Sequence, residues 1–576
     1  MADLRPRADS CDLIMKGGIA SGIAYPAAVL AMKDRYRFVN IGGASAGAIA
    51  AAATAAAEYA RDDVAAEDGF TRLNEMRLAL QQPDLLPRLF QPTRQAKPVI
   101  DLLYALQSRH AGRIGVAIRT LVQWVWLPVM IEVSLVLGLL VLTVHNTGGR
   151  WSSVRPAGWV GFGFLLAVAT AACLAATIAA RAARLLIVHI PSNYFGMCTG
   201  KAEADARRPA LTDWMHNQIQ HICGHAAPLT FADLAKKGIH LRVMATDLTR
   251  ARPVRMPYDG DEYWFAPTEL AVLFPRDVLE YLIATCDQTR PADADVPELR
   301  RFPGDRLPIV VAARMSSSIP GLLAAVPLWT TVGDKPVRHW LCDGGLSSNF
   351  PIHFFDAWVP SRPTFGLNVI PASMAEQLPG SQDGAVQGRH DERPPMRRAT
   401  VRHAIDFAAQ IFDTMQNWRD TMQSELFQFR DRVADVVLSP GEGGRNIVMP
   451  PEVIARIDHK GRCAGEAFTR FDWPSHLLHR YAWLMQTLQR NLRHAEPGKP
   501  AGLSDALSPE FLQWLAAGAP GVERPLDRPV DWFQPAASAT KKLLEDANGW
   551  LDCADLSFAV GGVERPASIM RISPDV

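Results

Sequence analysis

A short apolar segment at residues 38–42 leads into Gly43-Ala44-Ser45-Ala46-Gly47, and an alanine-rich stretch continues from there to about residue 60. This order predicts a strand, a very tight turn and a helix. The glycines flank the serine because so tight a turn leaves no room for Cβ atoms. The Ser45 hydroxyl would then lie at the helix N-terminus, where N–H groups and the helix dipole stabilise negative charge. Such a turn is a nucleophile elbow, although GxSxG also occurs as a plain strand-to-helix contact.

A glycine-rich turn at residues 16–22 lies upstream, between an apolar strand at 13–15 and a predicted helix at 23–32. Its backbone N–H groups would suit a phosphate or an oxyanion. A dinucleotide site would need the GxGxxG spacing and an acidic residue at the end of a second strand, and neither is found. The turn therefore favours an oxyanion loop.

Far downstream, Asp343 ends the apolar run 340–342 and is followed by Gly344 and Gly345. A carboxylate at a strand end can accept the proton of a serine hydroxyl within hydrogen-bond reach, without a histidine. The ordinary alternative is an Asp-Gly turn with no chemical role.

Taken in this order, the three motifs resemble those of the patatin-like phospholipases, a family of lipid acyl hydrolases with a Ser/Asp dyad. Residues 229–248 resemble that family's central helix and strand, and residues 312–320 resemble its run before the catalytic aspartate. The resemblance covers roughly residues 10–370. It implies a three-layer α/β/α sandwich with a mostly parallel sheet, and it implies no metal and no cofactor.

The resemblance also implies roles for individual residues. The implied roles are nucleophile for Ser45, its catalytic partner for Asp343, oxyanion hole for Gly17, Gly18 and Ile19, elbow glycines for Gly43 and Gly47, and Asp-Gly-Gly motif for Gly344 and Gly345. In the family's usual loop, a third glycine and a basic residue stand where this chain has Ile19 and Ser21. Backbone N–H groups survive this change, whereas the positive charge is lost unless Lys16 replaces it.

An α/β-hydrolase with a Ser-His-Asp triad is the main alternative fold. In that fold the oxyanion loop lies well upstream of the elbow, and the catalytic histidine comes last in the chain. Here the glycine-rich turn precedes Ser45 by fewer than thirty residues, and Asp343 carries the Gly-Gly sequence. The order of motifs therefore favours the dyad.

Two apolar runs, residues 121–144 and 158–180, interrupt the resemblance, and Glu132 is the only charge within them. Each is long enough for the roughly 20-residue helix that crosses a bilayer. They predict a transmembrane hairpin, and the alternative is a pair of buried helices in a soluble domain. Glu132 would serve as a helix contact or a functional group. The alanine-rich second run would permit close helix packing, including a homo-oligomer through the hairpin.

Basic residues predict the orientation of this hairpin. Arginines lie outside it at positions 109, 113, 119, 181 and 184, and in its loop at 150 and 155. Because cytoplasmic flanks carry the excess of basic residues, both ends should be cytoplasmic. We expect a multi-pass protein with two spans and a cytoplasmic catalytic domain, in a bacterial inner membrane.

Charge and cysteine content limit the kinds of binding partner and the compartment expected for this protein. With 60 Lys and Arg against 59 Asp and Glu, the net charge is +1, which does not point to nucleic acid. The eight cysteines are scattered, without a CxxC pair, which indicates a reducing compartment and no zinc site. No apolar stretch follows the charged first residues, so we expect no secretory signal.

We therefore predict four parts. They are residues 10–110 and 190–372 as the two portions of the patatin-like domain, 115–186 as the hairpin insertion, and 396–576 as a mainly helical, mixed C-terminal extension. Between the last two parts we expect a surface loop at 375–395. Within the C-terminal extension we expect an amphipathic helix at 401–429, a strand at 433–438 and a closing strand at 568–572.

The predicted function is that of a membrane-anchored serine lipid acyl hydrolase cleaving fatty-acyl esters of phospholipids or other acyl lipids. The alternative is a non-catalytic lipid-binding or scaffold protein on the same fold.

Overall fold

The computed structural model describes most of the chain between residues 8 and 551. The gaps are residues 19–20, 63–67, 83–84, 108–114, 116–155 apart from 126, 129–138, 141–142 and 145–146, then 204–205, 207, 259–262, 294–295, 333–334, 358, 372–384, 388–430 apart from 407, 411 and 414, then 440, 443–447, 493–506, 519 and 521–528.

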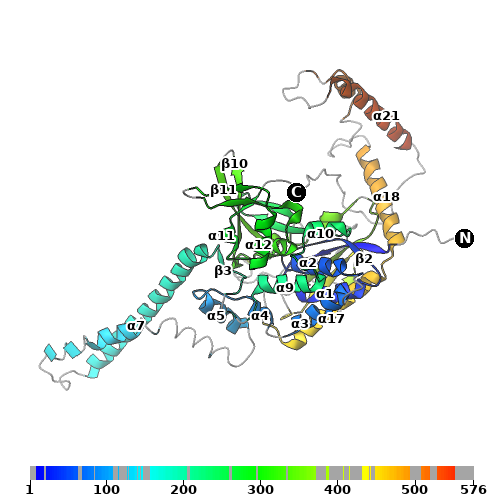
Figure 1. Ribbon diagram of the computed structural model, residues 1–576. Coiled ribbons are helices and arrows are strands. Elements are labelled where there is room, and N and C mark those ends of the chain that lie inside the picture. Colours follow the sequence, from blue (N-terminus) through cyan, green and yellow to red (C-terminus); the bar gives the residue numbers. More distant parts are fainter. Residues whose placement is uncertain are drawn as a thin grey trace. The chain divides into compact units, whose positions relative to one another are not determined.

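A mixed sheet forms the centre of the fold (Figure 1). Among the described residues its order is β13-β14-β12-β1-β2-β4-β11-β10-β6-β8-β7, and β5 pairs with β4. The strands are β1 (Ser10–Met15), β2 (Arg37–Ala44), β4 (His240–Asp247), β5 (Arg252–Met256), β6 (Trp264–Phe265), β7 (Thr289–Arg290), β8 (Leu299–Arg301), β10 (Val326–Val332), β11 (Lys335–Asp343), β12 (Thr364–Pro371), β13 (Ala385–Gln387) and β14 (Val433–Leu438). A separate pair joins β3 (Gly196–Cys198) to β9 (Gly321–Leu323).

The prediction of a mostly parallel sheet is wrong. Strands β14, β12, β1, β2 and β4 are parallel neighbours, whereas β4 pairs antiparallel with both β5 and β11, and the strands beyond β11 are also antiparallel. Short connections explain the difference, because only two residues separate β10 from β11 and such a loop permits only an antiparallel hairpin. Apolar strand patterns do not distinguish these two kinds of pairing.

The two faces of the central strands meet different neighbours. Ile14, Ala44 and Met244 pack against the segment that contains Phe350 and Ile352. On β2 the opposite face carries Gly43, where an added Cβ would lie 2.5 Å from the backbone of Gly47. Helix α2 (Ala46–Tyr59) therefore lies directly on this second face. The helices with the most extensive contacts to α2 are α3 (Gly69–Leu80), α9 (Leu211–Cys223) and α13 (Ile309–Ser316).

Helix α1 (Ala24–Met32) packs along α17 (Pro451–Thr469). Gly461 and Gly465 make this close approach possible, since an added Cβ would meet the carbonyl oxygens of Ala24 and Ala28 at 2.0 and 2.3 Å. A segment from far along the chain is thus part of the same unit as the N-terminal strands.

One helix of the predicted insertion has the character of a membrane span. Helix α7 (Pro156–Arg184) continues through a π-helical turn at Leu185–His189 into α8 (Ile190–Ser192). Within the described residues, only its portion Leu166–Ser192 is long and apolar enough, by length and composition, to cross a membrane. The first predicted span is represented by the shorter helix Val129–Gly138, and most other residues of 121–144 lie outside the described part. A second span is therefore not established.

The chain divides into two compact units. One contains residues 8–355 and 362–471, and the other contains residues 1–7, 356–361 and 472–576. The second unit includes α18 (Trp473–Leu492), α20 (Pro509–Ala516) and α21 (Phe533–Leu551). The prediction of a C-terminal extension over residues 396–576 stays a prediction, and the second unit begins its long C-terminal segment at residue 472.

Strand β14 confirms the predicted strand at 433–438. Strand β13 lies where a surface loop was expected, and it pairs with β14, a contact between segments that local composition does not reveal. The predicted helix at 401–429 falls almost wholly, and the predicted strand at 568–572 wholly, outside the described residues.

Candidate active site

Ser45 lies between the end of β2 and the start of α2, in a backbone conformation that non-glycine residues rarely adopt. Its φ is 55° and its ψ is −129°. Strain of this kind persists where the surrounding structure holds it. An added Cβ at Gly47 would lie 2.1 Å from the carbonyl oxygen of Met15, which explains why a glycine must follow the serine at this spacing. The predicted elbow geometry is therefore present.

Asp343 ends β11 next to this elbow, where it pairs with Ala245 of β4. The Ser45 hydroxyl donates a hydrogen bond of 2.7 Å to Asp343 Oδ2. Asp343 Oδ1 accepts a second one, of 2.8 Å, from the Gly345 N–H. Ser45 is 6% and Asp343 5% exposed, so the pair is largely shielded from water.

Burial changes the acidity of this carboxyl group. It raises the pKa of Asp343 from 3.8 to about 7, although the hydrogen bonds from Ser45 and Gly345 favour the charged form. A group with a pKa near neutrality is suited to accept a proton and to return it. The neighbouring serine hydroxyl is its hydrogen-bonded partner.

The end of α13 and the residues that follow it hold both Ser45 and Asp343 in place. Ser316 Oγ accepts a hydrogen bond of 2.9 Å from the Ser45 N–H, and the Ser318 carbonyl accepts one of 3.0 Å from the Asp343 N–H. Arg314, fully buried, donates to Ser318 Oγ at 2.6 Å. Sequence reasoning found this segment only through its resemblance and gave these residues no role. The cluster of three serines was the available signal.

The glycine-rich turn approaches the elbow closely. A Cβ at Gly17 would lie 2.8 Å from Ser45 Cβ, so a side chain would not fit there. The Gly17 N–H, however, donates to the Asn349 carbonyl at 2.8 Å, and it is engaged rather than directed at a substrate. Gly18 has a φ of 146°, which favours glycine, and Ile19 lies outside the described residues. The oxyanion interpretation therefore depends on Gly18 and Ile19.

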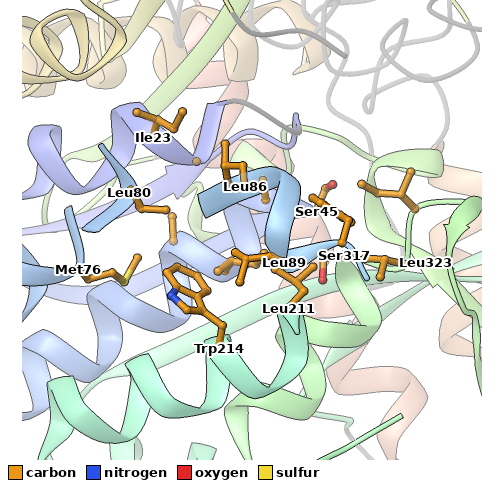
Figure 2. A pocket seen from close by; sticks show the side chains of 16 residues that line it. Ile23, Ser45, Met76, Leu80, Leu86, Leu89, Leu211, Trp214, Ser317 and Leu323 are labelled. Carbon is orange, nitrogen blue, oxygen red and sulfur yellow. The ribbon is translucent and has the colours of Figure 1, made fainter. Parts of the chain in front are cut away.

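A cavity opens beside Ser45 (Figure 2). Apart from Ser45 and Ser317, its labelled lining is almost entirely apolar. Met76, Leu80 and Trp214 lie across the cavity from Ser45 in this view. Helices α2, α3 and α9 and the short helix α4 (Leu85–Leu89) contribute these walls. The sequence did not predict this cavity, because the residues that line it come from segments far apart in the chain.

Within the described part of the chain, no group of three or more His, Cys, Asp or Glu side chains could hold a metal ion. The described cysteines are all free thiols.

The mixed α/β sheet and the serine elbow beside an aspartate agree with what sequence comparison finds: the chain belongs to the patatin-like phospholipase family. A model of that family, described as Patatin-like phospholipase, matches residues 223–356. The chain is 34% identical to a protein of Rhizobium meliloti (strain 1021) named RpoH suppressor, over 99% of each chain. It is 26% identical to the uncharacterized protein YqhO of Bacillus subtilis (strain 168), over 33% of this chain and 43% of that one.

Two solved structures give distant matches. VipD from Legionella pneumophila matches with a TM-score of 0.27 and 13% identity, over 95% of this chain and 89% of that one. The type III effector ExoU matches with a TM-score of 0.25 and 13% identity, over 95% and 64%. TM-scores this low add nothing to the family assignment, which rests on sequence comparison.

Proposed function

We propose that the protein is a membrane-anchored serine hydrolase that cleaves fatty-acyl esters of phospholipids or related acyl lipids. The observation that carries this proposal is the 2.7 Å hydrogen bond between Ser45 and Asp343, made at a strained elbow that opens on an apolar cavity. Lipid acyl hydrolysis is also the activity for which the family is named.

In the proposed reaction, Asp343 accepts the proton of Ser45 as the serine oxygen attacks the ester carbonyl carbon. Backbone N–H groups of Gly18 and Ile19 would stabilise the negative charge that develops on the carbonyl oxygen. Asp343 then returns the proton to the departing alcohol, which leaves Ser45 acylated. Water attacks this acyl-enzyme and gives a proton to Asp343. Asp343 passes that proton to the departing Ser45 oxygen, and the fatty acid is released.

The cavity beside Ser45 would hold the acyl chain. Its apolar lining suits a hydrocarbon and offers few polar groups that a sugar or peptide would need. An acyl chain that enters the cavity carries its ester carbonyl to Ser45, since the serine is itself part of the lining. The apolar lining of the cavity thus supports an acyl lipid as the substrate class.

Membrane anchoring is part of the same proposal. Helix α7 supplies one candidate span, and Glu132, from the shorter helix Val129–Gly138, interacts electrostatically with Cys173 of α7. This contact supports pairing of the two apolar runs as a hairpin, because a carboxyl group in lipid requires such a partner. By the positive-inside rule, the catalytic unit would lie in the cytoplasm. The small residues of α7 would also let a second copy pack against it.

Covalent labelling tests the proposal. A fluorophosphonate reacts only with an activated serine, so the full-length protein in detergent should gain one adduct, at Ser45. Ser45→Ala should abolish labelling, whereas Ser192→Ala, at an exposed serine, should not change it. Absence of labelling in the folded wild type would favour the non-catalytic scaffold.

A further inference from the structure

A cluster of aromatic residues lies where the α7–α8 helix ends. Phe195 and Trp340 meet edge to face, with ring centroids 4.8 Å apart and an interplanar angle of 90°. Tyr194 lies beside the same indole at 6.2 Å. Phe195 remains 44% exposed and Trp340 is half-buried, so this contact does not remove the rings from solvent.

The backbone holds two of these aromatic residues in an unfavourable conformation. Tyr194 and Phe195 have φ values of 51° and 63°, in the left-handed region that side chains rarely adopt. Hydrogen bonds fix this turn, from the Phe195 N–H to the Ile190 carbonyl and from the Ala325 N–H to the Tyr194 carbonyl, each at 2.8 Å. Consecutive strained residues that present an exposed ring indicate a functional constraint on the ring's position.

An ion pair between Arg338 of β11 and Glu269 supports the cluster. The Arg338 guanidinium lies 4.3 Å from the centre of the Trp340 ring and 2.6 Å from Glu269 Oε1. Glu269 Oε2 accepts a hydrogen bond of 3.0 Å from the Trp329 indole. Because Arg338 is paired, the cluster presents rings rather than a free positive charge.

Exposed aliphatic side chains continue this surface on two sides. In the turn that follows β4, Leu248 is 50% exposed, and its N–H donates a hydrogen bond of 2.9 Å to the Trp340 carbonyl. Along the helix, Leu186, Ile187 and Val188 are 63%, 73% and 51% exposed. We call these residues, with Phe195 and Trp340, the apolar collar.

We propose that the apolar collar is a second membrane contact, which enters the interfacial region of the bilayer. The collar begins within the segment Leu166–Ser192 that is apolar enough to cross a membrane, so the same bilayer surface would meet both. Arg181 and Arg184 lie in the last turn of α7, next to the collar, where arginine side chains can reach the lipid headgroups. Aromatic rings on an apolar surface are typical of the membrane interface. The inference rests on the proposed anchoring by α7.

The collar is also joined to the cavity beside Ser45. Gly196, next to Phe195, pairs with Gly321 of β9. Ile319 and Leu323, on either side of Gly321, line the cavity. Insertion of the collar would therefore position this wall of the cavity with respect to the bilayer, and a lipid would have a short path from the membrane to Ser45.

A fluorescent amino acid at position 195 tests the contact directly. It is introduced by codon suppression into full-length protein carrying Ser45→Ala, so that the result does not depend on catalysis. The protein is reconstituted in phosphatidylcholine vesicles that contain shallow spin-labelled lipid. We expect at least about twofold quenching at position 195 and little at position 78, an exposed leucine of α3 in the same unit. Equal quenching at the two positions would overturn the proposal.

Activity gives a second readout. Phe195→Asn keeps a residue that tolerates the left-handed conformation, and Trp340→Thr suits a strand. Together they should lower phospholipid turnover in vesicles about tenfold, the scale of one large buried apolar side chain, and leave a soluble ester unaffected. Equal loss on both substrates, or loss on neither, would contradict a membrane role. Leu78→Asn is the matched control.

Discussion

Asp343 shows how the environment of one residue defines its chemistry. In water a carboxyl group with a pKa of 3.8 is too weak a base to activate a serine hydroxyl. Here burial disfavours its charged form and raises the pKa to about 7, while Ser45 stays within hydrogen-bond distance. The proposed base is thus charged and reactive near neutrality.

This raised pKa predicts the pH dependence of activity. Below pH 7 Asp343 is protonated and cannot accept the Ser45 proton, so kcat/KM on a soluble ester should fall as pH drops, with an apparent pKa near 7. A flat profile between pH 5 and 8 would contradict the assignment.

The same shift has a consequence for stability, with the opposite sign. Folding raises the pKa of Asp343. The contribution of this carboxyl group to the free energy of unfolding is therefore fully present below pH 4 and is lost as pH rises towards 7. Asp343→Asn should remove this part of the pH dependence of unfolding.

Trp214 is expected to limit the acyl chain, because this buried side chain lies across the cavity from Ser45. Trp214→Phe leaves a smaller ring there and should raise kcat/KM for long-chain esters relative to short-chain esters by a few-fold. The rate on an acetyl ester is the internal control, since its chain would not reach position 214. An unchanged ratio would place the acyl chain elsewhere.

At the scale of elements, α17 supports α1, the helix that follows the glycine-rich turn. Gly461→Ala would bring a methyl group within 2.0 Å of the Ala24 carbonyl oxygen. Overpacking should destabilise the fold by about 1–3 kcal/mol, more than the roughly 1 kcal/mol that alanine gains in helix propensity. Thermal unfolding in detergent would show a lower midpoint.

Gly163→Ala is the matched control for this substitution. Gly163 lies in α7, and its added Cβ would meet no atom within 4 Å. The control should leave the midpoint unchanged or raise it slightly. A midpoint for Gly461→Ala that does not fall below that of the control would contradict the tight contact between α1 and α17.

The local sequence predicted the elements that depend on local geometry. Gly43 and Gly47 indicate the elbow because the turn itself excludes side chains. The antiparallel part of the sheet, the Ser316 contact and the Asn349 contact with Gly17 were not predictable. Each depends on which distant segments pack together, and neither periodicity nor motif spacing specifies that.

At the scale of the whole molecule, the apolar insertion separates Ser45 from Asp343 in sequence. Its ends return to one compact unit, so the unit's chemistry need not depend on the insertion. Replacing residues 115–186 with a short linker should leave cleavage of a soluble ester largely intact. Turnover of phospholipid in vesicles should fall sharply, because tethering raises the effective concentration of a membrane substrate.

This deletion also separates the possible roles of the insertion. Equal loss on both substrates would mean that the insertion is needed for folding. Loss on neither would restrict it to localisation or assembly. The full-length protein should also stay with membranes after an alkaline wash, and its recovery as soluble protein without detergent would contradict anchoring.

The most direct measurement is fatty-acid release from phospholipid vesicles by the full-length protein and by Ser45→Ala, Asp343→Asn and the double variant. Each single substitution should reduce the rate by at least about a thousandfold, and the double variant should lose little more, because the two residues act as a unit. Ser192→Ala should retain the wild-type rate. Full activity in either single variant would contradict the Ser45–Asp343 dyad.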